Sequence, residues 1–206
     1  MCKKFFYSFI LLIFAQSAIK GQLVERFTDG NFTANPSWTG NNADFIVNSD
    51  LQLQSNNTVA SSNYYLSTAN SLATVAEWEF WIKLDFNPSS ANYVDTYLTA
   101  SASDLSVNST YGYFVRIGGA DDEISLFKKS NTGTITKIID GADGLLNKSS
   151  NTIKIRVIRN EENRWILFRD ISGSGNSFVS EGSIVDSTYN TSSFFGFLVK
   201  QSTASF

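Results

Sequence analysis

The 206-residue chain contains no histidine, one cysteine and two prolines. Without histidine, the usual Ser-His-Asp and Cys-His catalytic arrangements cannot form, and zinc sites built from His and Cys ligands are excluded as well. The sequence also lacks a Walker-type phosphate loop and a glycine-rich dinucleotide fingerprint. Any chemistry in this protein would therefore rest on carboxylates or on calcium bound through oxygen ligands.

The N-terminus has the three parts of a secretory signal peptide. Lys3 and Lys4 precede the apolar run "FFYSFILLIFA", which is followed by small or polar residues. We predict a signal peptide over 1–21, with cleavage close to Gly21, and a mature protein that is secreted or held at the outer cell surface. A retained membrane anchor is the alternative, although the apolar run is short for a helix that spans a bilayer.

The predicted mature chain is acidic and has no cysteine. Cys2 and three of the 16 basic residues lie within 1–21, which leaves the 19 acidic residues in excess. Such a chain is a poor binder of nucleic acid, because neutralising phosphates requires clustered Lys and Arg. No later apolar stretch approaches membrane-spanning length. An exported chain without disulfides needs a core or bound ions, and residues 22–206 suffice for one domain with such a core.

Alternation of apolar and polar residues recurs along the chain, and helical periodicity is nearly absent. In "EWEFWIKLDF", residues 77–86, every second residue from Trp78 is apolar, which indicates a half-buried strand of an antiparallel sheet. The turn-forming segment "NPSSAN" follows, and we expect 93–100 to be the hairpin partner of this strand. Only 140–149 is expected to hold a helical turn. The expected strands are Leu23–Phe27, Phe45–Val47, Leu51–Gln54, Tyr64–Ser67, Glu77–Phe86, Tyr93–Ala100, Gly112–Gly118, Glu123–Lys129, Thr134–Ile139, Ser150–Arg159, Arg164–Asp170 and Ser193–Lys200.

Many short strands separated by Gly, Asn and Ser predict an all-β sandwich or barrel. The segments "ERFTDGNFTANPSWTGNNADFIVNSDLQLQ", "WEFWIKLDFNPSSANYVDTYLTAS", "YGYFVRIGGADDEISLFKKSNTG" and "SSFFGFLVK" resemble the concanavalin A-like, laminin-G-like jelly-roll module. The version they resemble most stands at the N-terminus of large secreted or surface proteins of Gram-negative bacteria. The resemblance implies two antiparallel sheets of curved strands, a concave face that carries the sugar site in relatives that bind sugar, and further domains C-terminal to the module.

One departure from that pattern concerns the last strand. Modules of this type usually add a final strand after the one that ends in "FFGFLVK", and that strand lies beside the first. Here the chain ends at "QSTASF", so Leu23–Phe27 is expected to lack a partner and to leave an exposed edge. We predict a domain truncated at its C-terminus; a sandwich that ends early is the alternative.

The stretch 77–86 also invites comparison with jelly-roll glycosidases, which carry Glu-x-Asp-x-x-Glu along one strand. Retention requires two carboxyl groups about 5 Å apart, one as nucleophile and one as acid/base. Aligned here, the three positions are Glu77, Glu79 and Ile82, so the acid/base is missing. We therefore predict no catalytic residues and interpret the two acids as solvent-facing side chains of a strand.

Trp81 lies on the polar side of its predicted strand, next to Glu79. If 93–100 pairs with this strand, Tyr97 lies on the same side, and the alternation in 112–118 places Arg116 outward as well. Aromatic rings stack on the apolar faces of sugars while polar groups bind the hydroxyls. We predict a carbohydrate-binding site at Trp81, Tyr97, Arg116 and Glu79. The alternatives are that this surface is covered by the packing of the second sheet, or that Trp81 and Tyr97 form an ordinary cross-strand pair.

Two turns combine carboxylates with glycine, "GGADDE" at 118–123 and "DGADG" at 140–144. Calcium prefers converging oxygen ligands, so Asp121, Asp122, Asp140 and Asp143 are candidate calcium ligands. Asp and Gly are also ordinary turn residues, and neither turn has the spacing of a calcium-binding loop.

Three functions are compatible with these features. The first is a non-catalytic surface module that binds a polysaccharide or surface glycan, or that serves in adhesion. The second is a polysaccharide hydrolase or lyase on the same fold, which the incomplete carboxylate motif and the absence of histidine disfavour. The third is a structural spacer that binds nothing, because one fold serves many purposes.

Overall fold

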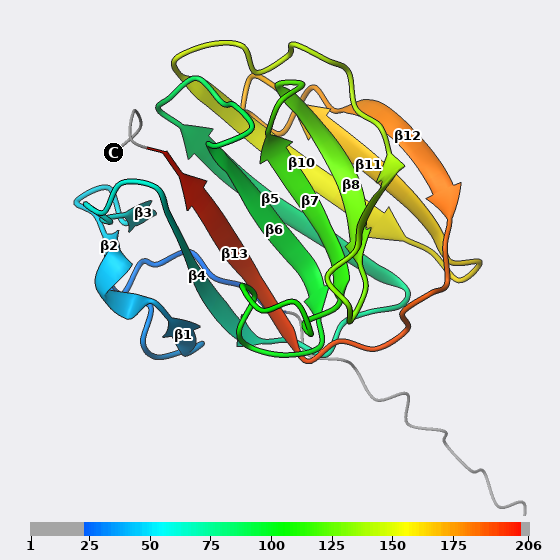
Figure 1. Ribbon diagram of the computed structural model, residues 1–206, viewed down its shortest axis with the longest axis horizontal. Coiled ribbons are helices and arrows are strands. Elements are labelled where there is room, and N and C mark those ends of the chain that lie inside the picture. The colour runs from blue at the N-terminus through cyan, green and yellow to red at the C-terminus, as the bar shows by residue number, and fades with distance from the viewer. Residues whose placement is uncertain (1–22, 203–206) are drawn as a thin grey trace, which may run out of the picture.

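The computed structural model describes residues 23–202, which form two antiparallel β-sheets stacked face to face (Figure 1). The larger sheet has seven strands in the order β1-β4-β13-β6-β7-β8-β9, and the smaller has four in the order β12-β11-β10-β5. β2 and β3 form a separate two-stranded sheet. The predicted all-β sandwich is confirmed. The predicted signal peptide lies outside the described residues, and none of the described helices is long and apolar enough to cross a bilayer.

Most strands occur where alternation predicts them, within about two residues. The strands are β1 (Trp38–Gly40), β2 (Phe45–Val47), β3 (Leu53–Ser55), β4 (Ser62–Ala69), β5 (Ala76–Leu84), β6 (Tyr93–Ala100), β7 (Gly112–Gly118), β8 (Glu123–Lys129), β9 (Ile135–Ile139), β10 (Asn151–Arg159), β11 (Arg164–Asp170), β12 (Val179–Val185) and β13 (Phe194–Gln201). A 3₁₀ helix, η1 (Asn42–Asp44), precedes β2. Residues 140–149 contain a turn rather than a helix.

The inward faces of the two sheets form one core. Trp78 of β5 stacks on Trp165 of β11 with ring centroids 5.6 Å apart, and Tyr113 of β7 meets Trp165 from the other sheet at 4.4 Å. Side chains of this size each stabilise the fold by roughly 1.5–3 kcal/mol when fully buried. This aromatic contact between the layers therefore fixes how the two sheets lie on each other.

The expected hairpin of 77–86 with 93–100 is wrong. β5 pairs along its whole length with β10, from Ala76 opposite Arg159 to Leu84 opposite Asn151, whereas β6 lies between β13 and β7 in the other sheet. The segment after β5 does turn, with Ser89 and Asn92 bridged, but it carries the chain from one layer to the other. Alternation predicts which face of a strand is apolar, and it does not predict which strand lies alongside.

The expected strand Leu23–Phe27 is also wrong. This segment is irregular, although Leu23 and Phe27 pack against the core, and Phe27 lies against Trp38 with ring centroids 6.1 Å apart. Apolar contacts hold it in place without a ladder of backbone hydrogen bonds. Alternation of apolar and polar residues does not predict β1 and β12, because β1 has only three residues and β12 is largely exposed.

Arg159, at the end of β10, is 1% exposed although it carries a charge. Its Nη1 donates to the carbonyl oxygens of Ala73 (2.7 Å) and Tyr189 (2.8 Å), and its Nη2 donates to the side-chain oxygens of Asn163 (2.8 Å) and Asn190 (2.6 Å). The guanidinium also lies 4.8 Å from the ring of Trp165. One side chain thus ties three loops to the same end of the sandwich.

Replacing Arg159 by Met should lower the free energy of unfolding by about 3 kcal/mol, because the change leaves several buried acceptors without a donor. Urea unfolding followed by tryptophan fluorescence measures the effect. Arg164→Met is the matched control, since Arg164 is exposed and its loss should cost less than about 0.5 kcal/mol. Equal stability of the two variants would show that Arg159 does not hold the loops.

Candidate functional site

The structure separates the four residues of the predicted sugar site into two pairs. Glu79 and Trp81 of β5 lie on the outer face of the four-stranded sheet. Side chains alternate along a strand, and those on the other side of β5, such as Trp78 and Leu84, belong to the core between the sheets. Tyr97 and Arg116 lie on the outer face of the seven-stranded sheet. The prediction that Trp81 and Tyr97 share one surface is wrong, since it depended on the hairpin that does not form.

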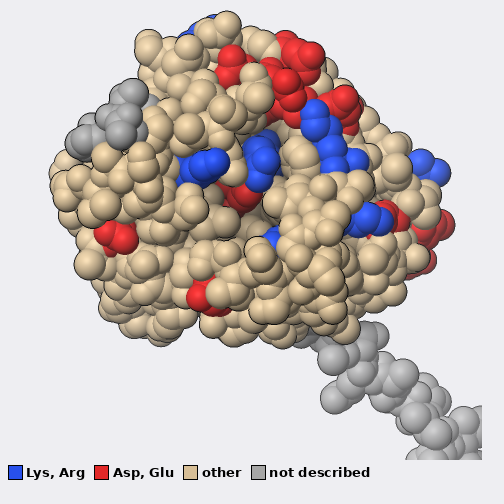
Figure 2. All heavy atoms as spheres, in the orientation of Figure 1, with Lys and Arg blue, Asp and Glu red and all other residues tan. Residues whose placement is uncertain are grey.

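The outer face of the seven-stranded sheet is hollowed in its middle, where basic side chains surround a recessed acidic one (Figure 2). We call this region the charged hollow and define it by Tyr93, Asp95, Arg116 and Lys200. The sheet register brings these residues together, because Asp95 lies directly opposite Arg116 and Tyr93 lies directly opposite Lys200. Residues opposite each other on one face of a sheet have side chains in contact range.

Asp95 and Arg116 form a two-point ion pair at the bottom of the charged hollow. Nε of Arg116 lies 2.7 Å from Oδ1 of Asp95, and Nη2 lies 2.8 Å from Oδ2. Burial raises the pKa of Asp95, and the hydrogen bonds from Arg116 oppose that rise. The geometry is the parallel pairing in which guanidinium and carboxylate bind most strongly, so Arg116 is held in one orientation.

The ring of Tyr93 lies between two cations of the charged hollow. The guanidinium carbon of Arg116 is 4.0 Å from the ring centroid, and Nζ of Lys200 is 5.3 Å from it. Lys200 donates to the carbonyl oxygen of Ser90 at 3.2 Å. In the described part of the chain, nothing accepts a hydrogen bond from Nη1 of Arg116, and the hydroxyl of Tyr93 is likewise unbonded. These polar groups can still bind a ligand.

Tyr97 forms the floor beside the charged hollow and is only 1% exposed. Its ring stacks on Phe114 at 5.0 Å, and Phe114 stacks on Phe127 at 5.4 Å. The loop 101–111 covers this aromatic cluster through the buried Leu105. Tyr97 therefore supports the surface and does not reach a ligand directly, which sequence alternation could not reveal because the covering loop comes from elsewhere on the face.

Two of the four predicted calcium ligands, Asp121 and Asp140, lie around a lysine together with Glu123. Nζ of Lys137 is 2.6 Å from Glu123, 2.6 Å from Asp140 and 3.7 Å from Asp121. Burial alone would lower the pKa of Lys137, but Asp140 and Glu123 raise it, so the ammonium stays charged. Asp122 does not join this contact, and Asp143 is exposed on its turn.

These carboxylates do not fit a calcium ion. An ammonium group already lies where their oxygens converge, and a divalent cation beside it would be repelled. Within residues 23–202, no group of three or more acidic side chains is placed to hold a metal. The residue that the sequence reasoning did not consider is Lys137 of β9, which precedes Asp140 by three positions.

Two solved structures have folds similar to that of this chain. The exoplasmic/lumenal domain of VIP36, in its Ca²⁺/Man-bound form, aligns with a TM-score of 0.55 at 12% identity over 81% of this chain and 76% of that chain. A legume lectin-like domain from Entamoeba histolytica aligns with a TM-score of 0.54 at 14% identity, over 84% of this chain and 85% of that one. The fold is similar to that of legume lectin-like domains. No protein-family profile and no curated protein sequence matches.

The legume lectin-like fold agrees with the concanavalin A-like resemblance of the sequence. At these identities the likeness concerns the fold alone. The Ca²⁺/Man3GlcNAc-bound form of the VIP36 domain aligns equally well, with a TM-score of 0.55. What the present chain binds must therefore be argued from its own side chains.

Replacing Lys137 by Met should destabilise the protein by about 1–3 kcal/mol, because Glu123 is buried and would lose its cation. Calcium and EDTA should leave the melting temperature of the parent protein unchanged. Differential scanning fluorimetry with and without millimolar calcium checks both statements. A melting temperature that rises with calcium in the parent protein would contradict the assignment of Lys137 as the cation of this cluster.

Proposed function

We propose that this protein is a non-catalytic carbohydrate-binding module and that the charged hollow is its binding site. The observation that carries the proposal is the fixed guanidinium of Arg116, which Asp95 orients beside the ring of Tyr93 and which keeps one nitrogen unbonded. A recess with an aromatic surface and a few converging polar groups is the usual form of a ligand site.

The polar groups of the charged hollow suit sugar hydroxyls. Arg116 and Lys200 supply donors, and the hydroxyl of Tyr93 both donates and accepts. The half-buried ring of Tyr93 provides apolar surface for the C–H face of a pyranose. The mannose-bound and Man3GlcNAc-bound forms of the similar VIP36 domain support a glycan as ligand.

The carboxylates of this face support a binding role rather than hydrolysis. Both oxygens of Asp95 accept from Arg116, and Glu123 is paired with Lys137. Glycoside hydrolysis needs one carboxyl group that gives up a proton and a second that acts as nucleophile or base. Carboxylates fixed in ion pairs are poorly placed for either task. The ammonium group of Lys137 supports binding that does not use calcium at the cluster of Asp121, Glu123 and Asp140.

The setting we propose is a secreted or cell-surface one, with this module at the N-terminus of a longer polypeptide. The signal-like N-terminus and the resemblance to surface-protein modules support this setting. The intact mass of the protein exported by its own host tests it.

Tyr93→Ala and Lys200→Met should each weaken glycan binding by about tenfold or more, which corresponds to about 1.4 kcal/mol per variant. Both residues are partly exposed, so the fold should survive their replacement. A glycan array followed by isothermal titration with the best-bound glycan measures the loss. Lys148→Met is the control, because Lys148 is an exposed lysine outside the charged hollow and its variant should bind like the parent.

Two results would contradict this proposal. Unchanged binding in the Tyr93→Ala and Lys200→Met variants would place the site elsewhere. No binding of the parent protein to any arrayed glycan, with the circular dichroism of a folded β-protein, would favour the structural spacer.

A further inference from the structure

The second pair of predicted residues lies on the opposite side of the molecule. Trp81 is 41% exposed, whereas Trp38, Trp78 and Trp165 are 2%, 6% and 0% exposed. An indole so exposed on the face of a sheet loses much of the stabilisation that its burial would provide. The side chains and the loop next to Trp81 leave its ring accessible and restrict its position.

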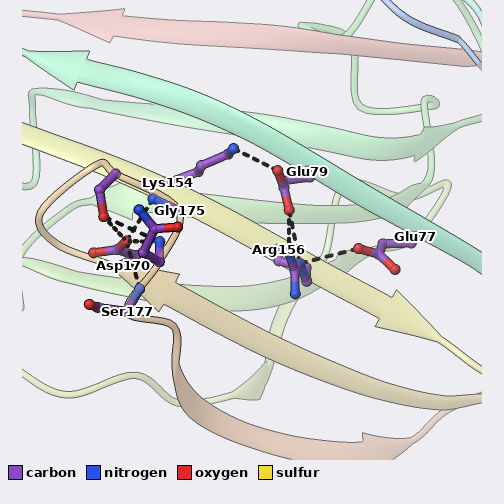
Figure 3. Close-up of polar contacts among 9 residues, drawn as sticks. Glu77, Glu79, Lys154, Arg156, Asp170, Gly175 and Ser177 are labelled. Atoms are coloured by element: carbon purple, nitrogen blue, oxygen red, sulfur yellow. Dashed lines mark hydrogen bonds and ion pairs between the residues drawn. The ribbon is translucent and has the colours of Figure 1, made fainter.

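Ion pairs link side chains of β5 and β10 on the face that carries Trp81, and Figure 3 shows those of Glu79 with Lys154 and Arg156. Lys154 of β10 lies directly opposite Trp81 and bonds Glu79 at 2.7 Å. Arg156 bonds the same Glu79 at 2.6 Å and contacts Glu77 at 3.2 Å, with Phe178 covering its guanidinium at 4.2 Å. These partly exposed pairs contribute little to stability, but they orient the side chains next to the indole.

The loop 170–177 forms a wall beside Trp81. The carboxylate of Asp170 accepts hydrogen bonds from the backbone N–H groups of Ser172 (2.8 Å), Gly175 (2.8 Å), Asn176 (3.1 Å) and Ser177 (3.2 Å), and the hydroxyls of Ser172 (2.6 Å) and Ser174 (3.1 Å) donate to it as well. Hydrogen bonds from Ser172 hold the pKa of Asp170 well below its usual range. The carboxylate of Asp170 therefore stays ionised and holds the loop 170–177 in one conformation.

Glycine lets this wall approach the indole. A Cβ added at Gly173 would lie 3.2 Å from Nε1 of Trp81 and 2.5 Å from Cγ2 of Thr152, and φ of Gly173 is +69°. A Cβ added at Gly175, whose φ is +78°, would lie 2.9 Å from Cδ of Lys154. Only residues without side chains fit here. The result is an exposed aromatic ring with a rigid polar wall along its nitrogen edge.

The charges around Trp81 are balanced. The carboxylates of Glu77, Glu79 and Asp85 are matched by Arg156, Lys154 and Lys83 in ion pairs, and Asp170 is held by N–H and O–H donors. Lys83, Lys154 and Arg156 are thus each paired with a carboxylate, which disfavours an anionic ligand next to Trp81. Besides the indole, the loop 170–177 exposes the apolar side chain of Ile171 (48%).

We propose that Trp81 is a second glycan-binding site, which takes an uncharged sugar ring of a neutral polysaccharide. The sugar stacks its C–H face on the exposed indole, and its hydroxyls bind the polar groups of the wall and of Lys154. This site lies on the outer face of the four-stranded sheet, so it is independent of the charged hollow on the other sheet. A module with two such faces can bind two chains of a polysaccharide at once.

Acrylamide quenching of tryptophan fluorescence tests the proposal, because Trp81 is the exposed one among the four tryptophans. The probes are laminarin and a soluble mannan as neutral polysaccharides, and alginate as an acidic one. At least one neutral probe should reduce quenching by half or more, and alginate should not. Trp81→Phe should itself remove most of the quenching in the absence of sugar, which verifies the assignment of the signal.

Two variants keep the result unambiguous. Lys200→Met, in the charged hollow, should retain the protection of Trp81, whereas Trp81→Ala should reduce binding of the protecting polysaccharide by about tenfold in affinity electrophoresis. Protection that disappears in Lys200→Met would show that the signal arises from the charged hollow, and it would overturn the second site. The absence of protection by either neutral probe, or unchanged binding in folded Trp81→Ala, would overturn it as well.

Discussion

The pairing of β5 with β10 is the constraint on which the rest of this structure depends. Nine residues of each strand form one continuous antiparallel ladder, and this ladder places Trp78 against Trp165 in the core. Because β5 is committed to the smaller sheet, the chain must cross to the other layer before β6 begins. The outward-facing residues of β6, which include Asp95 and Tyr97, consequently lie on the other side of the sandwich from Trp81.

The two outer faces use charge in opposite ways. On the seven-stranded sheet, one recessed carboxylate, Asp95, lies among cations of three neighbouring strands, and Arg116 is oriented by it. On the four-stranded sheet, acids and bases alternate across strands and cancel. A buried ion pair is held firmly because an unpaired charge there is costly, whereas an exposed ladder mainly sets the positions of its side chains. The first arrangement leaves polar groups available in a recess, and the second leaves a neutral surface around one ring.

Loops complete both faces, and each loop is fixed by a few specific hydrogen bonds. The loop 101–111 covers Tyr97 and is tied to β8 by the bond from Lys129 to the carbonyl oxygen of Val107, at 2.7 Å. The loop 170–177 is tied by Asp170. Lys137 has a related effect at the edge of the larger sheet, where its ammonium gathers acidic side chains that would otherwise repel one another.

The sequence by itself determined the fold class and most strand positions, because alternation of apolar and polar residues, as in 77–86, depends on local geometry. It also determined that Trp81, Glu79 and Arg116 point away from the core. Only the tertiary structure decided which of them share a face, since strand neighbours are set by pairing between distant segments. It likewise decided that Tyr97 is covered by a loop and that Lys137 lies between Asp121 and Asp140, because both depend on residues brought together by the folded sheets.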